Sequence, residues 1–215
     1  MGRPQYSFEE MKAAVDEAAL WGRKVAAHAH GSEAIKMAVR AGVTSIEHCS
    51  LVDDEGVRLM AERGTWLVPT IYCVDYVLGE YGKLGFPEHI LNKARQVDTQ
   101  RIDTFRRALA AGVHVAFGTD AGVYPHGQNG REFKYMVERG MTPMQAIQSA
   151  TKGAAELVGW KDKVGQLAPG YYADLIAVGG DPVADVRQLE NVPFVVKGGV
   201  LYKNTLTADA VAETK

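Results

Sequence analysis

The chain has 215 residues, of which 47% are hydrophobic and 23% are charged, and its formal net charge is -2. This composition is typical of a globular protein, and the near-zero charge gives no electrostatic basis for binding nucleic acid or an anionic membrane. No apolar stretch approaches the roughly 18 residues of a membrane span, and the polar first residues do not resemble a secretory signal, so we expect a cytoplasmic protein.

The first three-quarters of the sequence repeats a pattern of a strand followed by a helix. Apolar and β-branched runs predict four strands, at residues 24–29, 44–49, 65–70 and 113–119. Amphipathic patterns predict helices, at residues 8–22, 32–42, 53–64 and 88–111. Ser32 is the expected N-cap of the second helix. This alternation at short spacing predicts parallel βαβ units.

The C-terminal part of the sequence has a different pattern. A loop rich in glycine and proline over residues 120–130 is followed by two predicted helices, at residues 131–139 and 143–158. The pair Gly198-Gly199 between apolar runs predicts a two-residue hairpin turn. Because strands dominate from about residue 162, we expect two domains, residues 1–161 and residues 162–215.

Histidines and an aspartate follow the predicted strands at their C-terminal ends. His28 and His30 end the first strand, His48 ends the second and Asp120 ends the fourth. In a parallel barrel these ends share the face that carries active sites, and residues i and i+2 of one strand point to the same side. Taken singly, each residue is more typical of a core, rim or helix-capping position. Their coincidence favours a site for Zn²⁺, with Mn²⁺ or another divalent ion as alternatives.

Four segments together resemble the C-terminal half of the amidohydrolase superfamily, in its imidazolonepropionase-like and Xaa-Pro dipeptidase-like branch. They read KVAAHAHG…AVRAGVTSIEHC, GTDAGVYPHG, TPMQAIQSATKGAAELVG and VGQLAPGYYADLIAV. The resemblance implies an α/β fold in which this chain supplies strands 5–8 of a (β/α)₈ TIM-type barrel. It also implies that the C-terminal strands belong to a small β-sandwich built from both chain ends.

The resemblance also implies roles for individual residues. His28, His48 and Asp120 match metal ligands, and Asp120 also matches the catalytic acid and base. His30 matches a catalytic position that contacts the substrate or polarises its carbonyl group. The family's complete site holds one or two ions. Its HxH pair on strand 1 and its carboxylated lysine on strand 4 cannot be placed here, so this chain carries about half of the expected metal site.

Further substrate contacts are predicted outside the strand ends. Residues 71–87 form a long excursion rich in aromatic side chains, Tyr72 among them. It is predicted as a loop that acts as a lid or substrate wall, with surface packing or a subunit contact as the alternative. His126 and Asn129 follow Asp120 closely enough to reach a substrate, or else they form hydrogen bonds only within their loop.

Two functional hypotheses follow. The first is a metal-dependent hydrolase of amide or peptide-like bonds, acting on dipeptides or cyclic amides. It would need a complementing N-terminal half or a site shared in a homo-oligomer. The second is a truncated, non-catalytic half-barrel that self-associates and binds at most one ion weakly. A nucleotide-binding protein is disfavoured because no glycine-rich phosphate loop follows a predicted strand. Cys49 and Cys73 form no CxxC pair, which argues against a zinc knuckle or a disulfide framework.

Overall fold

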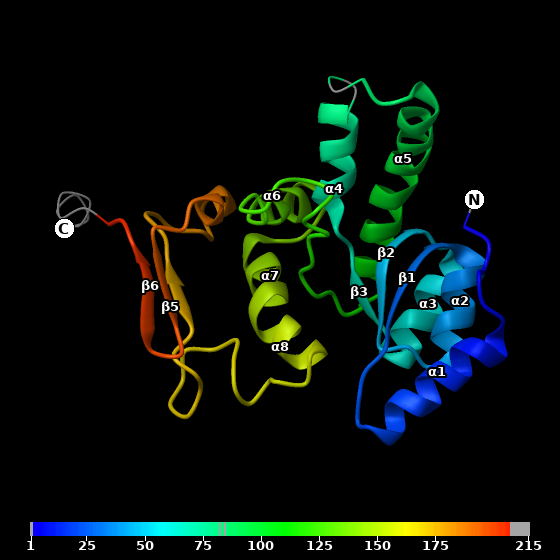
Figure 1. Ribbon diagram of the computed structural model, residues 1–215, viewed down its shortest axis with the longest axis horizontal. Helices are drawn as coiled ribbons and strands as arrows, with labels where there is room; N and C mark the ends of the chain where they lie inside the picture. Colours follow the sequence, from blue (N-terminus) through cyan, green and yellow to red (C-terminus); the bar gives the residue numbers. More distant parts are fainter. Residues whose placement is uncertain (1, 82, 84, 207–215) are drawn as a thin grey trace. The chain divides into compact units, whose positions relative to one another are not determined.

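The computed structural model describes residues 2–81, 83 and 85–206, and it divides into two compact units, Met1–Pro125 and His126–Lys215 (Figure 1). The first unit is α/β and the second combines helices with a small antiparallel sheet. Within the described part of the chain, none of the helices combines the length and apolar character that crossing a bilayer requires. The domain boundary expected after residue 161 stays a prediction.

A parallel sheet forms the centre of the first unit. Its strands stand in the order β1 (Ala26–Gly31), β2 (Ser45–Leu51) and β3 (Trp66–Val68), which confirms the first three predicted strands. Ile46 of β2 pairs with Ala27 on one side and with Leu67 on the other, and it is fully buried. The middle strand therefore has helices over it and a strand on each edge, as expected for consecutive βαβ units.

The fourth predicted strand, residues 113–119, is shorter than expected. It is reduced to a single parallel bridge between Val115 and Leu67, held by hydrogen bonds from Leu67 N–H to His114 O and from Ala116 N–H to Leu67 O. The ladder cannot extend further along β3 because Pro69 has no N–H to donate. The next residue, Thr70, has a φ of +45°, which turns the chain out of the strand direction.

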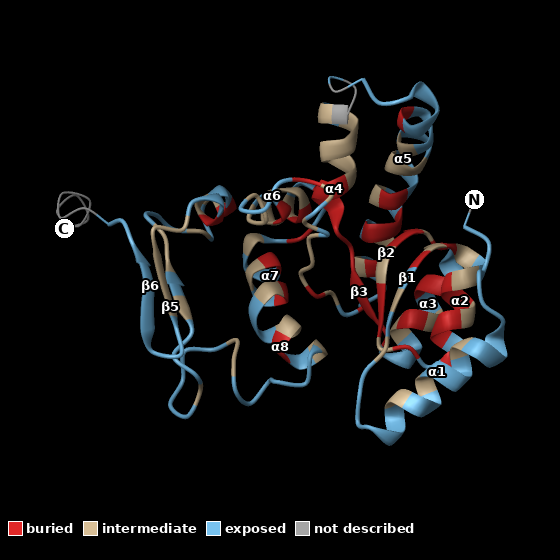
Figure 2. Ribbon diagram, in the orientation of Figure 1, coloured by how far each residue is buried: buried red, intermediate tan, exposed pale blue. Residues whose placement is uncertain are grey.

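Helices flank this sheet at the predicted positions. They are α1 (Phe8–Leu20), α2 (Ser32–Ala41), α3 (Asp54–Arg63) and α5 (Glu88–Ala110). Helix α2 buries Ile35, Ala38 and Val39 as predicted, and Figure 2 shows its inner face among the buried parts of the chain. The N-cap prediction for Ser32 is wrong. Gly31 precedes the helix without a side-chain cap, and the Ser32 hydroxyl instead accepts a hydrogen bond from the N–H of Asp53.

The excursion after β3 is helical rather than a loop over most of its length. Helix α4 (Ile71–Tyr76) continues into a π-helical turn, Val77–Tyr81. The buried guanidinium group of Arg101, on α5, donates to the carbonyl of Ile71 and to the carboxylate of Asp75. This tertiary anchor has no signal in the local sequence, which explains why a loop was expected.

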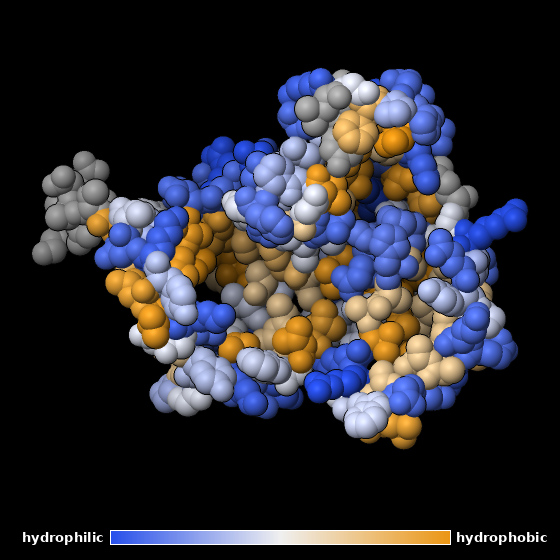
Figure 3. All heavy atoms as spheres, in the orientation of Figure 1, coloured by the Kyte–Doolittle hydropathy of each residue, from blue (hydrophilic) through white to orange (hydrophobic). Residues whose placement is uncertain are grey.

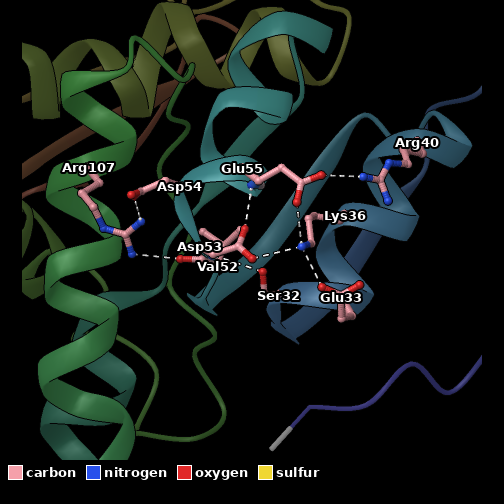
Figure 4. A network of polar contacts seen from close by, with 10 residues as sticks. Ser32, Glu33, Lys36, Arg40, Val52, Asp53, Asp54, Glu55 and Arg107 are labelled. Carbon is pink, nitrogen blue, oxygen red and sulfur yellow. Dashed lines mark hydrogen bonds and ion pairs between the residues drawn. The ribbon is translucent and has the colours of Figure 1, made fainter.

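A network of charges joins α2, α3 and α5 (Figure 4). The ammonium group of Lys36, whose side chain is 7% exposed, lies within 3.1 Å of three carboxylates, those of Glu33, Asp53 and Glu55. Burial opposes ionisation of Asp53, but hydrogen bonds from Gly56 N–H, Ser32 and Lys36 lower its pKa to about 2. Arg107 joins the network from α5 by donating to Asp54 and to the carbonyl of Val52. The network thereby fixes how the helices stack beside the sheet.

The second unit begins with the two predicted helices. They are α6 (Arg131–Glu138) and a continuous helical run made of α7 (Pro143–Gln148), a π-helical turn (Ser149–Gly153) and α8 (Ala154–Leu157). Thr142 caps α7 in a reciprocal arrangement with Gln145, as its position before Pro143 predicts.

A three-stranded antiparallel sheet follows, with a short 3-10 helix (Val186–Glu190) between its first two strands. The strands are β4 (Leu175–Ala177), β5 (Phe194–Lys197) and β6 (Val200–Asn204), in the order β4-β5-β6. Gly198 and Gly199 form the predicted two-residue turn with φ of +56° and +77°, values that favour glycine at both positions. Figure 3 shows apolar side chains on the surface of this sheet, where Val200, Leu201 and Tyr202 are all more than half exposed.

Candidate metal centre

Three histidine rings meet at the C-terminal ends of β1 and β2. His28 and His30 both come from β1, and the register of the two strands sets His48 opposite Ala29, between them. The ring centroids are 4.4–4.9 Å apart in all three pairs. Nδ1 of His28 and Nε2 of His48 are 3.0 Å apart. The structure thus brings together the three histidines that the sequence singles out.

Hydroxyl groups from β2 and from the turn after β3 contact two of these rings. Thr70 Oγ1 lies 2.6 Å from Nδ1 of His48, and Ser50 Oγ lies 2.9 Å from Nδ1 of His30. A hydrogen bond at one ring nitrogen fixes the ring orientation and leaves the other nitrogen for a ligand. Thr70 therefore orients His48 so that its Nε2 faces His28.

Burial keeps two of the histidines neutral near pH 7. The pKa of His30 is lowered to about 4, mainly by burial and to a smaller extent by repulsion from His48 and His28. Burial, followed by repulsion from His28, lowers the pKa of His48 to about 4. A neutral imidazole keeps the lone pair that a metal ion needs, so both rings are in the form that can bind one.

These shifts predict that the protein loses stability as the pH falls from about 6.5 to about 4. Unfolded histidines bind protons below a pKa of about 6.5, whereas His30 and His48 in the folded chain do so only near 4. The unfolded state therefore binds more protons in this window, and the stability that is full above 6.5 declines toward 4. Glu47, whose pKa burial raises, contributes in the opposite direction and reduces the slope.

Urea midpoints at about pH 7 and about pH 5 measure the effect, because the midpoint follows the free energy of unfolding when the slope is constant. His30→Gln, which stays neutral throughout, is expected to show a smaller difference between the two midpoints. An unchanged difference in H30Q would assign the acid sensitivity to other groups.

Asp120 joins His48 in a second group of donors. One ring nitrogen of His48, the thiol of Cys73 and a carboxylate oxygen of Asp120 all lie within 4.8 Å of one another. Asp120 is exposed, and Cys73, in the first turn of α4, is buried. His48 belongs to both groups. The sequence does not predict Cys73 as a donor, because Cys73 forms no CxxC pair and does not end a predicted strand.

Backbone strain is concentrated at these same positions. Among the described residues, four non-glycine residues have a positive φ, namely His48, Cys49, Thr70 and Asp120. Such conformations cost of order 1–3 kcal/mol each and persist only where the surrounding structure imposes them. Three of the four are a donor or the hydroxyl that orients one, which supports a functional role for this end of the sheet.

The spacing of two of the donors fits a divalent ion, whereas His28 and Asp120 fall in different donor groups. Two nitrogens bound to one tetrahedral zinc ion at about 2.0–2.1 Å lie roughly 3.3 Å apart. The 3.0 Å between His28 Nδ1 and His48 Nε2 is close to that separation. Imidazole nitrogens with a carboxylate are ligands that suit zinc and related ions.

Space for a small molecule adjoins the histidines. A cavity of about 740 Å³ lies beside β1, and its lining includes His28, His30, Tyr6, Met11 and Val25. Volumes of several hundred cubic ångströms are typical of small-molecule sites. The cavity therefore offers room for a ligand next to two of the predicted site residues.

The three residues predicted to contact a substrate lie outside the histidine cluster. Tyr72 is 3% exposed and packs against Tyr124, with ring centroids 4.6 Å apart. His126 and Asn129 belong to the second unit, where His126 is exposed and Asn129 accepts a hydrogen bond from the N–H of Gly127. The substrate contacts assigned to these residues stay predictions.

Comparison with known proteins identifies relatives across most of the chain. The sequence profile of the amidohydrolase family matches residues 1–202. Ochratoxinase of Aspergillus niger is 38% identical over 204 residues, which are 93% of this chain and 42% of that protein. Imidazolonepropionase of Cutibacterium acnes is 29% identical over 195 residues, which are 89% of this chain and 43% of that protein.

Solved structures show the same relationship. A Xaa-Pro dipeptidase with bound methionine in the active site is 50% identical, with a TM-score of 0.88, over 94% of this chain and 50% of that one. The chain thus spans about half the length of the relatives it matches, and the matched part is their C-terminal half.

Proposed function

The chain belongs to the amidohydrolase family, and we propose that it supplies half of the active site of a metal-dependent hydrolase of amide bonds. The observation that carries this proposal is the 3.0 Å approach of His28 Nδ1 to His48 Nε2 at the ends of adjacent parallel strands. Two imidazole donors at ligand spacing, on the face where barrel enzymes build their sites, are the arrangement that such a hydrolase needs.

His28, His48 and Asp120 would hold the ion, which we propose to be Zn²⁺, with Mn²⁺ as the alternative. A bound divalent ion polarises a carbonyl oxygen and lowers the pKa of water to near 7. The hydroxyl of Thr70 keeps the His48 ring in the orientation that binding requires. The number of ions in the complete site, one or two, depends on residues outside this chain.

Asp120 and His30 would carry the proton transfers and the charge. The exposed Asp120 carboxylate would accept a proton from the attacking water and deliver it to the leaving nitrogen. His30 is neutral near pH 7 because of its low pKa, and its Nδ1 lies 2.9 Å from the hydroxyl of Ser50. In the tautomer that we propose, the Ser50 hydroxyl would donate a hydrogen bond to Nδ1, and the ring proton would lie on Nε2. That N–H would stabilise the developing oxyanion of the substrate carbonyl.

The relatives suggest the class of substrate. They include a Xaa-Pro dipeptidase, an ochratoxinase and imidazolonepropionases, and a solved prolidase is described in complex with N-methylphosphonate-L-proline. We therefore propose a peptide-like substrate, with a cyclic amide as the alternative. Tyr72, His126 and Asn129 are the proposed substrate contacts.

The proposed architecture is the second half of a (β/α)₈ barrel, with β1, β2, β3 and the Val115 segment as strands 5–8. Residues 1–161 would form this half-barrel, and residues 162–215 would contribute β4–β6 to a small sandwich. The exposed apolar side chains of β6 support a second layer over that sheet. The other half of the site would come from a further polypeptide segment or from a second copy in a homo-oligomer.

The test is turnover of a dipeptide panel that includes Xaa-Pro sequences, by the 215-residue chain with added Zn²⁺ or Mn²⁺ and after chelation. Ion-dependent release of amino acids is the expected result where a second copy completes the site, so the oligomeric state is measured in the same buffer. A non-catalytic half-barrel is the second candidate, favoured by the match to only about half of each relative. Absence of turnover, with the chain a monomer or a symmetric dimer in solution, would favour it.

A further inference from the structure

The thiol of Cys73 is a donor for which neither the sequence motifs nor the proposed hydrolase accounts. Its sulfur lies within 4.8 Å of a ring nitrogen of His48 and of a carboxylate oxygen of Asp120. We infer that Cys73 is a ligand of the divalent ion, which the chain would hold through nitrogen, oxygen and sulfur together. This inference rests on the ion site proposed above, and it adds a thiolate to that site.

The position of the thiol follows from the turn between β3 and α4. Thr70, with its φ of +45°, turns the chain away from the direction of β3. Cys73 follows three residues later, in the first turn of α4. The same Thr70 contacts Nδ1 of His48 through its hydroxyl at 2.6 Å. One strained turn therefore fixes both the orientation of the His48 ring and the approach of the thiol to it.

The distances are compatible with a shared ion. Zinc binds thiolate sulfur at about 2.3 Å and imidazole nitrogen at about 2.0–2.1 Å, which places the two donors roughly 3.6 Å apart in a tetrahedral site. Because the two donor atoms lie within 4.8 Å of each other, a shift of at most about 1.2 Å brings them to this separation.

The other cysteine of the chain is also buried, but its sulfur has different neighbours. Cys49 is 1% exposed, its sulfur contacts Met60 Sδ at 3.7 Å, and burial raises the pKa of its thiol to about 12. It belongs to neither donor group. Cys49 is consequently the matched control for any measurement that detects sulfur on the ion.

A thiolate ligand changes which ions the site accepts. When the ion binds, the S–H bond of Cys73 breaks, its proton is released to solvent and a sulfur–metal bond forms. Thiolates favour Zn²⁺, Co²⁺ and Cd²⁺, whereas sites of oxygen and nitrogen are more tolerant of Mn²⁺. The chain is therefore expected to prefer the first group of ions.

Titration of the chain with Co²⁺ tests the inference, because a thiolate bound to cobalt gives a charge-transfer band in the near ultraviolet. The wild type and Cys49→Ala are expected to show the band. Cys73→Ser and Cys73→Ala are expected to lose it while they still bind Co²⁺, with affinity lower by on the order of tenfold or more. Circular dichroism of each variant checks that it is folded.

The outcomes separate this inference from the proposed function. Binding of Co²⁺ by the wild type without the band would overturn the role of Cys73 and leave the hydrolase proposal standing. A band that persists in both Cys73 variants would assign the sulfur to Cys49 and would also overturn it. If calorimetry detects no Co²⁺ binding by the wild type, both the inference and the ion site fail.

Discussion

His48→Ala is expected to weaken the affinity of the chain for Zn²⁺ by at least about 100-fold. Loss of a partner that only orients a ligand costs about 10–100-fold, so loss of the ligand itself costs no less. His48 also belongs to both donor groups, which means that neither group can hold the ion without it. Competition with a chromophoric chelator at pH 7 measures the affinity.

Two further variants are compared with His48→Ala in the same assay. His89→Ala removes an exposed histidine from the first turn of α5 and is expected to bind Zn²⁺ like the wild type. Asp120→Asn keeps the size of the side chain and one carbonyl oxygen, but it loses the carboxylate that would transfer the proton. Turnover should therefore fall by a larger factor than the affinity for Zn²⁺. An affinity of H48A within twofold of the wild type would place the ion elsewhere.

The sequence predicts the clustering of the three histidines well, because that clustering depends on regular strands. His28 and His30 are two residues apart on one strand, and His48 lies one βα unit later, so strand geometry alone places them together. Asp120 is expected at the same end of the sheet by the same reasoning. Cys73 could not be predicted in this way, because its approach to His48 depends on the left-handed turn at Thr70.

The errors in the predicted fold have a common physical origin in contacts between distant segments. The last strand is reduced to one bridge because its partner β3 ends at Val68, just before Pro69, which periodicity in residues 113–119 does not reveal. Residues 71–76 are helical although a loop was expected there, since Arg101 holds the first carbonyl of the helix from thirty residues away. Local sequence patterns predict helices and strands reliably only where contacts between distant segments favour the same structure.

Arg101→Met is expected to lower the free energy of unfolding by about 3 kcal/mol, because removal of one partner from a buried ion pair leaves the other charges uncompensated. The guanidinium group is 6% exposed and donates to Asp75, Asp98 and the carbonyl of Ile71. The carboxylates are 21% and 29% exposed, so water can compensate only part of the loss. Urea denaturation followed by circular dichroism measures the change.

The same helix offers a matched control for Arg101. Arg95 forms an ion pair of 2.7 Å with Glu88, but both side chains are more than half exposed, so Arg95→Met should cost less than about 1 kcal/mol. Arg101→Lys keeps the positive charge but lacks the planar guanidinium group. The free energy of unfolding that it loses should therefore lie between the losses of Arg101→Met and Arg95→Met. Because Arg101 anchors the start of α4, Arg101→Met should also weaken Zn²⁺ binding, whereas Arg95→Met should not. Equal stabilities of R101M and R95M would show that the buried guanidinium group does not hold α4 in place.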